Sequence, residues 1–176
     1  MRVMTLAEDL EADGEPEPEF VPGIATRMPR KIIAGGALVR DADGRVLFVE
    51  PAYKPFLDIP GGIAEPDESP LHACRREVAE ELGLTISIGR LLVVDWMPAH
   101  GAWADSLQFV YDGGVLTPDL ITAIRLDSAE LLSLRFMTLD EATPYLRASK
   151  VRRIAQALAA LNAGETRYAE FGRHSP

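Results

Sequence analysis

The stretch GIAEPDESPLHACRREVAEELGL, residues 62–84, contains the pattern of one amphipathic helix. Ser69 stands at an N-cap position, Pro70 follows as the first helical residue, and Gly83 lies just past the end. At about 100° per residue, a single apolar stripe is formed by Leu71, Cys74, Val78 and Leu82. The stretch therefore predicts a helix that packs this stripe against a core.

The same helix carries three closely spaced carboxylates. Glu77, Glu80 and Glu81 stand at i, i+3 and i+4, so they lie side by side on the neighbouring stripe. Like charges at this spacing repel one another by a few tenths of a kcal/mol per pair. A hard divalent cation bound through oxygen ligands would relieve that repulsion. Taken alone, however, such a cluster is also typical of a solvated acidic helix face.

The residues around the carboxylates complete a longer pattern. Gly62, Glu68 and 76–84 fill all nine specified positions of G-x5-E-x7-R-E-U-x-E-E-x-G-U, where U is an aliphatic residue. Pro60 and Gly61 precede it and complete the P-G-G that usually opens this signature. The sequence therefore resembles the Nudix hydrolases, enzymes that split diphosphate linkages with Mg²⁺ or Mn²⁺.

The resemblance implies a role for each residue of the signature. The implied metal ligands are Glu77, Glu80, Glu81 and the carbonyl of Gly61. The implied structural supports are Glu68, Arg76 and Gly62. Within this second group, Glu68 and Arg76 are expected to form an ion pair that fixes the loop against the helix.

A further carboxylate from a later loop often completes such a site. Glu130 is the preferred candidate, because Glu130 followed by Phe136 resembles a pattern in MutT-like members, although a surface-loop glutamate is an equal alternative. Asp105 and Asp127 are weaker candidates. Members of the family differ over the general base, which is left open between Glu81, Glu77 and Glu130.

Composition narrows the class of protein. A chain of 176 residues is long enough for one domain with a substantial core. The net charge of −9 argues against stable nucleic-acid binding, and a bound metal would offset its repulsion of phosphate-bearing substrates. The single cysteine, Cys74, excludes an intramolecular disulfide and a Cys-rich zinc site, and it fits a cytoplasmic location. The sequence has no apolar run of membrane-spanning length and no signal-peptide core.

The chain divides into three expected parts. Residues 1–27 alternate acidic residues with prolines, which predicts a surface tail, or alternatively an arm at a homodimer interface. Residues 28–164 form the expected Nudix domain, and residues 165–176 form an expected C-terminal tail.

Apolar patterning predicts the elements of the domain. Expected strands span 32–39, 45–50, 56–59, 85–96, 107–111 and 134–137, with a possible strand at 121–126 and a turn at 112–114. Expected helices besides the first span 139–146 and 149–164. The fold class is α/β, and the resemblance implies an α/β/α sandwich with a mixed sheet between helices.

The predicted function is metal-dependent hydrolysis of a diphosphate linkage in a nucleoside diphosphate joined to another group. The implied substrates are a nucleotide sugar, ADP-ribose or a nucleoside triphosphate. Possible base-stacking aromatics, which are otherwise core or rim residues, are Tyr53, Phe56, Trp96 and Trp103. The alternatives are a noncatalytic nucleotide-sensing domain and an isopentenyl-diphosphate isomerase. The isomerase needs a catalytic cysteine outside the signature helix, whereas Cys74 lies on that helix.

Overall fold

The computed structural model describes residues 5–15, 18–126 and 129–175, which separate into two compact units at Arg30 and Lys31. In the first unit, Thr5 and Glu8 form a capping box on helix α1 (Leu6–Asp13), and a short helix α2 (Ile24–Arg27) follows. Neither helix buries a side chain. The region predicted as a tail therefore contains local helices that contribute no core.

The second unit contains the remaining elements. Its strands are β1 (Ile32–Arg40), β2 (Val46–Pro51), β3 (Gly61–Ile63), β4 (Leu91–Met97), β5 (Ser106–Val115), β6 (Leu131–Met137), β7 (Arg167–Glu170) and β8 (Arg173–His174). Its helices are α3 (Pro70–Leu82), α4 (Pro118–Ala123), α5 (Leu139–Ala142), the 3₁₀ turn η1 (Thr143–Tyr145) and α6 (Ala148–Ala163). Within the described residues, no helix is long and apolar enough to cross a membrane.

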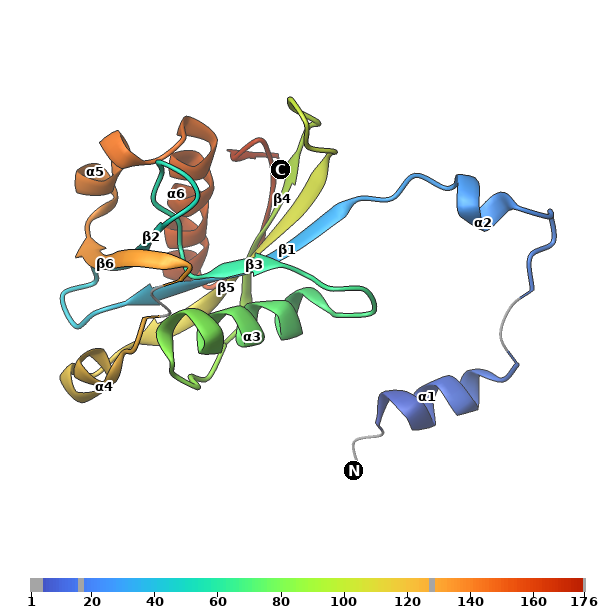
Figure 1. Cartoon of the computed structure of the whole chain (residues 1–176), viewed down its shortest axis with the longest axis horizontal. Coiled ribbons are helices and arrows are strands. Elements are labelled where there is room, and N and C mark those ends of the chain that lie inside the picture. The colour runs from blue at the N-terminus through green and yellow to red at the C-terminus, as the bar shows by residue number, and fades with distance from the viewer. Residues whose placement is uncertain (1–4, 16–17, 127–128, 176) are drawn as a thin grey trace. The chain divides into compact units, whose positions relative to one another are not determined.

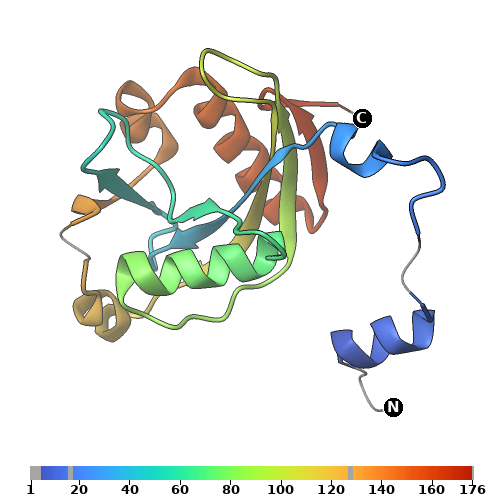
Figure 2. The same cartoon turned by 45° about the vertical axis from the view of Figure 1, so that its right-hand side comes forward.

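The strands join one mixed sheet in the order β6-β2-β1-β5-β4-β7-β8, with β3 paired to β1. Pairing is parallel between β1 and β5 and between β4 and β7, and antiparallel elsewhere. Helix α3 lies on one face of the sheet, and α5 and α6 lie on the other (Figures 1 and 2). The predicted sandwich with a mixed sheet between helices is confirmed.

Strand β1 shows why both faces of the sheet are covered. Leu38 belongs to the apolar cluster that includes Ile154 of α6, whereas Val39 belongs to the cluster that includes Val78 of α3. Because successive side chains of a strand point to opposite faces, an apolar run without alternation supplies both layers.

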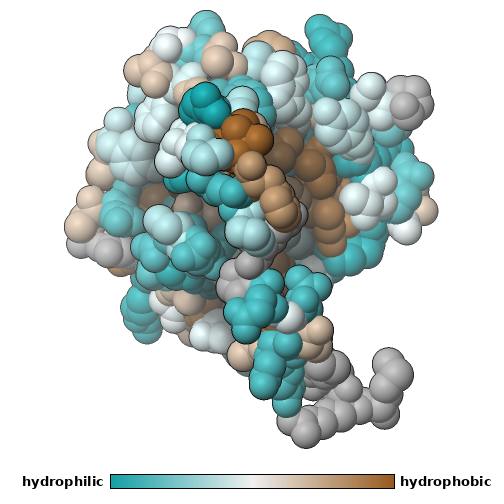
Figure 3. Space-filling view, turned by 90° about the vertical axis from the view of Figure 1, so that its right-hand side faces the viewer, coloured by the Kyte–Doolittle hydropathy of each residue, from teal (hydrophilic) through white to brown (hydrophobic). Residues whose placement is uncertain are grey.

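In the space-filling view, hydrophilic side chains cover most of the face shown and hydrophobic ones gather near its centre (Figure 3).

The predicted C-terminal tail at 165–176 is wrong, because this segment extends the sheet. Strand β7 pairs with β4, and β8 returns antiparallel to β7. Buried Asp95 accepts hydrogen bonds from Arg153 Nε at 2.6 Å and from the Gly172 amide at 2.8 Å. This contact fixes the C-terminal hairpin through a strand and a helix distant in sequence, which a local pattern does not reveal.

Other local predictions also differ from the structure. The strand predicted at 85–96 begins only at Leu91. The segment at 121–126 is no strand: its first half is the end of α4, whose Thr117 cap accepts a hydrogen bond from the Leu120 amide. The turn predicted at 112–114 lies within β5, where the register against β1 shifts. The strand predicted at 56–59 is reduced to a single bridge between Val49 and Asp58. The last helix begins at Ala148, one residue before its predicted start at 149.

Deletion of residues 1–26 is expected to leave a folded and active domain, because α1 and α2 bury no side chain and belong to their own unit. Thermal melts, hydrolysis rates and size-exclusion chromatography of the truncated chain test this. Loss of folded protein, or conversion of a dimer into an inactive monomer, would instead assign the segment a structural role.

Candidate functional site

The site lies where strands β1 and β2 separate. They pair only at Arg40 and Val46, and the same edge of β1 pairs with β3 at the earlier residues 34–36. The loop 52–60 fills the gap between them, and the Pro60 carbonyl accepts a hydrogen bond of 2.8 Å from the Ala37 amide. This arrangement sets the signature loop on β1, directly beside α3.

Helix α3 begins and ends as its sequence predicts. The Ser69 hydroxyl accepts a hydrogen bond from the His72 amide, Pro70 is the first helical residue, and Gly83 ends the helix with a φ of 64°. The helix buries Cys74, Val78 and Leu82 of the predicted stripe, together with Ala73 and Glu81. Leu71 packs against the same cluster while remaining partly exposed.

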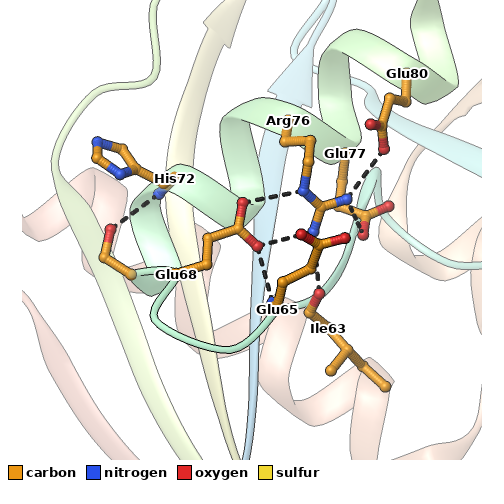
Figure 4. Close-up of polar contacts among 8 residues, drawn as sticks. Ile63, Glu65, Glu68, His72, Arg76, Glu77 and Glu80 are labelled. Carbon is orange, nitrogen blue, oxygen red and sulfur yellow. Dashed lines mark hydrogen bonds and ion pairs between the residues drawn. The ribbon is translucent and has the colours of Figure 1, made fainter.

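Arg76 is the centre of the polar network on this helix. Its guanidinium donates to both carboxylate oxygens of Glu68, at 3.0 Å from Nε and 2.9 Å from Nη2, and to the Ile63 carbonyl at 3.2 Å (Figure 4). It also donates to Glu77 at 2.9 Å and to Glu80 at 3.0 Å. Arg76 therefore ties the loop to the helix, as predicted, and in addition places one positive charge among the acidic side chains.

Glu68 shows the electrostatic effect of this network. The hydrogen bonds from Arg76, followed by the Glu65 amide, lower the pKa of Glu68 to about 2. Its carboxylate is thus held ionised and fully engaged by the protein, so it acts as a structural support of the loop.

Glu81 lies in the opposite situation. Its residue is only 7% exposed, and its Oε2 accepts a hydrogen bond of 2.8 Å from the Gly61 amide. Burial, with the charges of Asp58 and Glu77, raises the pKa of Glu81 to about 8, against the opposing effects of the Gly61 amide and of Lys54. Glu81 is therefore a buried carboxyl group whose ionised form lacks sufficient positive charge around it.

Glu77 lies beside the signature loop. A Cβ atom added to Gly62 would lie 2.3 Å from Cδ of Glu77, so glycine here lets this carboxylate keep its position, and any other residue would displace it. Burial, with the charges of Glu80 and Glu130, raises the pKa of Glu77 in spite of Arg76. Glu130, the carboxylate predicted from a later loop, therefore acts electrostatically on Glu77 of α3. Glu130 is exposed, and its backbone carbonyl accepts a hydrogen bond from the Ala52 amide.

The remaining candidates lie elsewhere. Asp105 is engaged by Lys31 and by Trp96 Nε1 at 3.4 Å, and Asp127 lies outside the described residues. Tyr53 and Trp103 are exposed. The Phe56 ring packs against the guanidinium of Arg147, whose Cζ lies 4.7 Å from the ring centre. Of these aromatics, Tyr53 and Phe56 belong to the loop 52–60, which leads into the signature.

Sequence reasoning missed a cluster of three charged residues: Lys54 and Asp58, which act on the pKa of Glu81, and Lys150, which pairs with Asp58. Lys54 Nζ lies 2.7 Å from Asp58 Oδ2, and Lys150 forms an ion pair with the same oxygen. Although burial opposes ionisation, Lys150 and Lys54 lower the pKa of Asp58 to about 2. The i, i+4 spacing of Lys54 and Asp58 was a weak signal, but nothing in the sequence points to Lys150.

The donor set of α3 fits a hard cation. Its carboxylates offer oxygen ligands, and burial leaves Glu77 and Glu81 short of positive charge. Among the described residues, no three His, Cys, Asp or Glu side chains already meet at the spacing of a formed metal site. The counter-charge of Glu77 and Glu80 is instead Arg76.

The metal-free protein is expected to lose stability as pH rises from about 5 to above 8. The pKa of Glu81 is raised on folding from 4.5 to about 8, so its contribution is complete below the unfolded value and is lost as the buried group ionises. Thermal melts in EDTA across this range measure the effect, and Glu81→Gln should flatten the slope. An equal slope in both proteins would contradict this assignment.

Cys74→Ala is expected to leave turnover within a few fold, at a stability cost of roughly 1 kcal/mol. Cys74 is fully buried, and burial raises the pKa of its thiol to about 12, which suits a packing role and opposes a nucleophilic one. Kinetics and melts of the variant test this. Lost activity in a folded protein would favour the isomerase alternative.

Comparison with known proteins agrees with the geometry. The family model of the NUDIX domain matches residues 30–161. A "MutT-like protein" from Streptomyces ambofaciens is 31% identical over 140 residues, which are 72% of this chain and 88% of that protein.

Solved structures share the fold. A MutT protein from Methanosarcina mazei has a TM-score of 0.61 at 23% identity, covering 79% of this chain and all of that one. The NUDIX domain of NrtR from Shewanella oneidensis, solved with ADP ribose, has a TM-score of 0.63 at 20% identity, covering 90% of this chain and 99% of that one. With the family match over most of the chain and the signature intact on α3, this protein belongs to the Nudix hydrolases.

Proposed function

We propose that this chain hydrolyses a diphosphate linkage in a nucleoside diphosphate joined to another group, with Mg²⁺ or Mn²⁺ as the cofactor. The observation that carries the proposal is the arrangement of Glu77 and Glu81 on a helix whose signature is complete: Glu81 is buried, Glu77 is partly buried beside Arg76, and burial raises the pKa of both carboxyl groups. Such carboxylates are costly for folding, and a divalent cation would supply the charge that they lack.

Glu77, Glu80 and Glu81 would hold the metal. When bound, it supplies charge neutralisation for the departing phosphoryl group and activates water. Glu80 is the most exposed of the three, with 56% of its side chain accessible, so it can exchange its bond to Arg76 for a cation without unfolding the site. Arg76 would remain attached to Glu68 and the Ile63 carbonyl, keeping the loop against the helix.

The residues of the signature loop orient this set. The Gly61 amide fixes one oxygen of Glu81, and Gly62 leaves room for Glu77 at the surface of β3. The Gly61 carbonyl, expected from the resemblance to assist the metal, stays part of the proposal. A role for Glu130 also stays part of the proposal, because its charge raises the pKa of Glu77.

A similar solved structure supports a nucleotide as the substrate class of this proposal. The Shewanella domain was solved with ADP ribose, a nucleoside diphosphate joined to a sugar. Nucleotide sugars, ADP-ribose and nucleoside triphosphates are therefore the substrates that we propose.

The experiment is a hydrolysis screen of the purified chain with Mg²⁺ or Mn²⁺. It should cover nucleotide sugars, ADP-ribose, NADH, dinucleoside polyphosphates and oxidised nucleoside triphosphates, with products separated by ion-exchange chromatography. Release of a nucleoside monophosphate from at least one compound is the expected result. Tight binding of one compound without turnover under either metal would replace the enzyme with a nucleotide-binding module.

A further inference from the structure

Two of the three lysines of the chain converge on one carboxylate. Lys54 lies in the loop between β2 and β3, and Lys150 lies in the first turn of α6. Both contact Oδ2 of Asp58, Lys54 at 2.7 Å. Because one carboxylate neutralises only one cation, this cluster keeps one excess positive charge in a protein whose net charge is −9.

The excess charge lies next to the carboxylates of α3. Lys54 and Asp58 both act on the ionisation of Glu81, Asp58 raising and Lys54 lowering its pKa, and Glu81 in turn raises the pKa of Lys54. Asp58 is also followed directly by 59–62, the segment that donates the Gly61 amide to Glu81. The cluster and the acidic set are therefore neighbours across the signature loop.

The two lysines differ in what surrounds them. The Lys150 side chain is 20% exposed, whereas that of Lys54 is 33% exposed. Lys54 also lines a hollow of about 380 Å³, in which Tyr53 and Leu132 are the exposed apolar residues. Its ammonium lies 5.3 Å from the centre of the exposed Tyr53 ring. Lys150 is thus the less exposed partner of Asp58, whereas Lys54 is the more exposed partner and borders a hollow on the surface.

We propose that Lys54 binds the diphosphate of the substrate, exchanging Asp58 for a non-bridging phosphate oxygen while Lys150 keeps Asp58 paired. The proposal rests on the hydrolase function above and adds a binding residue to it. The exchange is inexpensive because one anionic partner replaces another, and neither Asp58 nor Lys54 is left buried without a counter-charge. An ammonium with three donors suits a phosphate that approaches from solvent.

Binding of methylenediphosphonate tests the proposal without relying on turnover, because its P–C–P bridge is not hydrolysed. Isothermal titration of the full chain with this probe in the presence of Mg²⁺ should show about tenfold weaker binding for Lys54→Met, equal to about 1.4 kcal/mol. Lys54→Arg should restore most of the affinity. Lys31→Met is the matched control, because Lys31 is also ion-paired, with Asp105, but lies outside this cluster.

Thermal melts establish that each variant is folded, and Lys54→Gln replaces Lys54→Met if the latter is not. Unchanged affinity in the folded Lys54 variant would overturn the proposal, and so would an equal loss in Lys31→Met or no binding by the parent chain. Hydrolysis is scored separately. If the chain hydrolyses diphosphates and the Lys54 variants bind the probe as the parent does, only the role of Lys54 is contradicted. If binding depends on Lys54 but no diphosphate is hydrolysed, only the proposed reaction is contradicted.

Discussion

Replacing Glu81 with glutamine is expected to lower kcat by roughly 10²-fold or more while the protein stays folded. Glutamine keeps an oxygen that can accept the hydrogen bond from the Gly61 amide, so the contact between loop and helix survives. The substitution removes the negative charge that we propose to hold the metal. Because the pKa of Glu81 is raised to about 8, the metal-free protein holds this group mostly protonated at neutral pH, so the neutral glutamine should leave stability unchanged or higher.

Glu68→Gln is the matched control for that prediction. This variant also replaces a signature glutamate with glutamine, but the carboxylate that it removes accepts two hydrogen bonds from Arg76. We expect a smaller loss of rate and a larger loss of stability than for Glu81→Gln. Steady-state kinetics with saturating Mg²⁺ and thermal melts compare the two. A Glu81→Gln variant as fast as the parent would contradict the enzyme proposal.

Gly35→Ala is expected to have the largest effect on the scaffold of the site. A Cβ atom at this position of β1 would lie 2.0 Å from the Pro70 carbonyl oxygen and 3.1 Å from Cys74. The obstacle is helix backbone, so α3 must move away from the sheet. We expect a stability loss of about 1–3 kcal/mol. Displacement of the carboxylates should lower kcat by roughly 10²-fold even in folded protein.

Gly36→Ala is the control for this effect. A Cβ atom added to Gly36 would lie on the other face of the sheet from one added to Gly35. It would meet Ile59 Cδ1 at 3.2 Å and the Pro60 carbonyl oxygen at 3.3 Å. A small side-chain adjustment relieves most of that contact, so losses of stability and rate should be smaller. Melts and kinetics of both variants check this order. Equal effects would show that contact with α3 is not the cause.

The sequence predicted the features that are local. The caps and apolar stripe of α3 follow from side chains within one helix, and the structure places them as expected. The pairing of Glu68 with Arg76 was also predicted, because both residues belong to one contiguous signature. The double apolar run of β1 predicted a sheet covered on both faces, which the clusters around Leu38 and Val39 confirm.

Features that depend on tertiary contacts were not predictable in the same way. Lys150 reaches Asp58 across 92 positions of sequence, so no local pattern connects them. The strand at Arg167–Glu170 has little apolar content, and its pairing with β4 comes from the sheet itself. Helix α4 ends inside the segment 121–126, which was predicted as a possible strand, and its Thr117 cap favours the helix over a short apolar run.

The central claim is that α3 carries metal-dependent diphosphate hydrolysis, and its most direct test is the Mg²⁺ dependence of turnover. The measurement is the initial rate of nucleoside monophosphate release from the preferred substrate of the screen, across a Mg²⁺ titration and in EDTA. We predict a saturable rise with Mg²⁺ for the parent chain, no turnover in EDTA, and recovery when Mg²⁺ is returned. Equal rates with and without the metal, or no turnover of any compound with any divalent metal, would contradict the account.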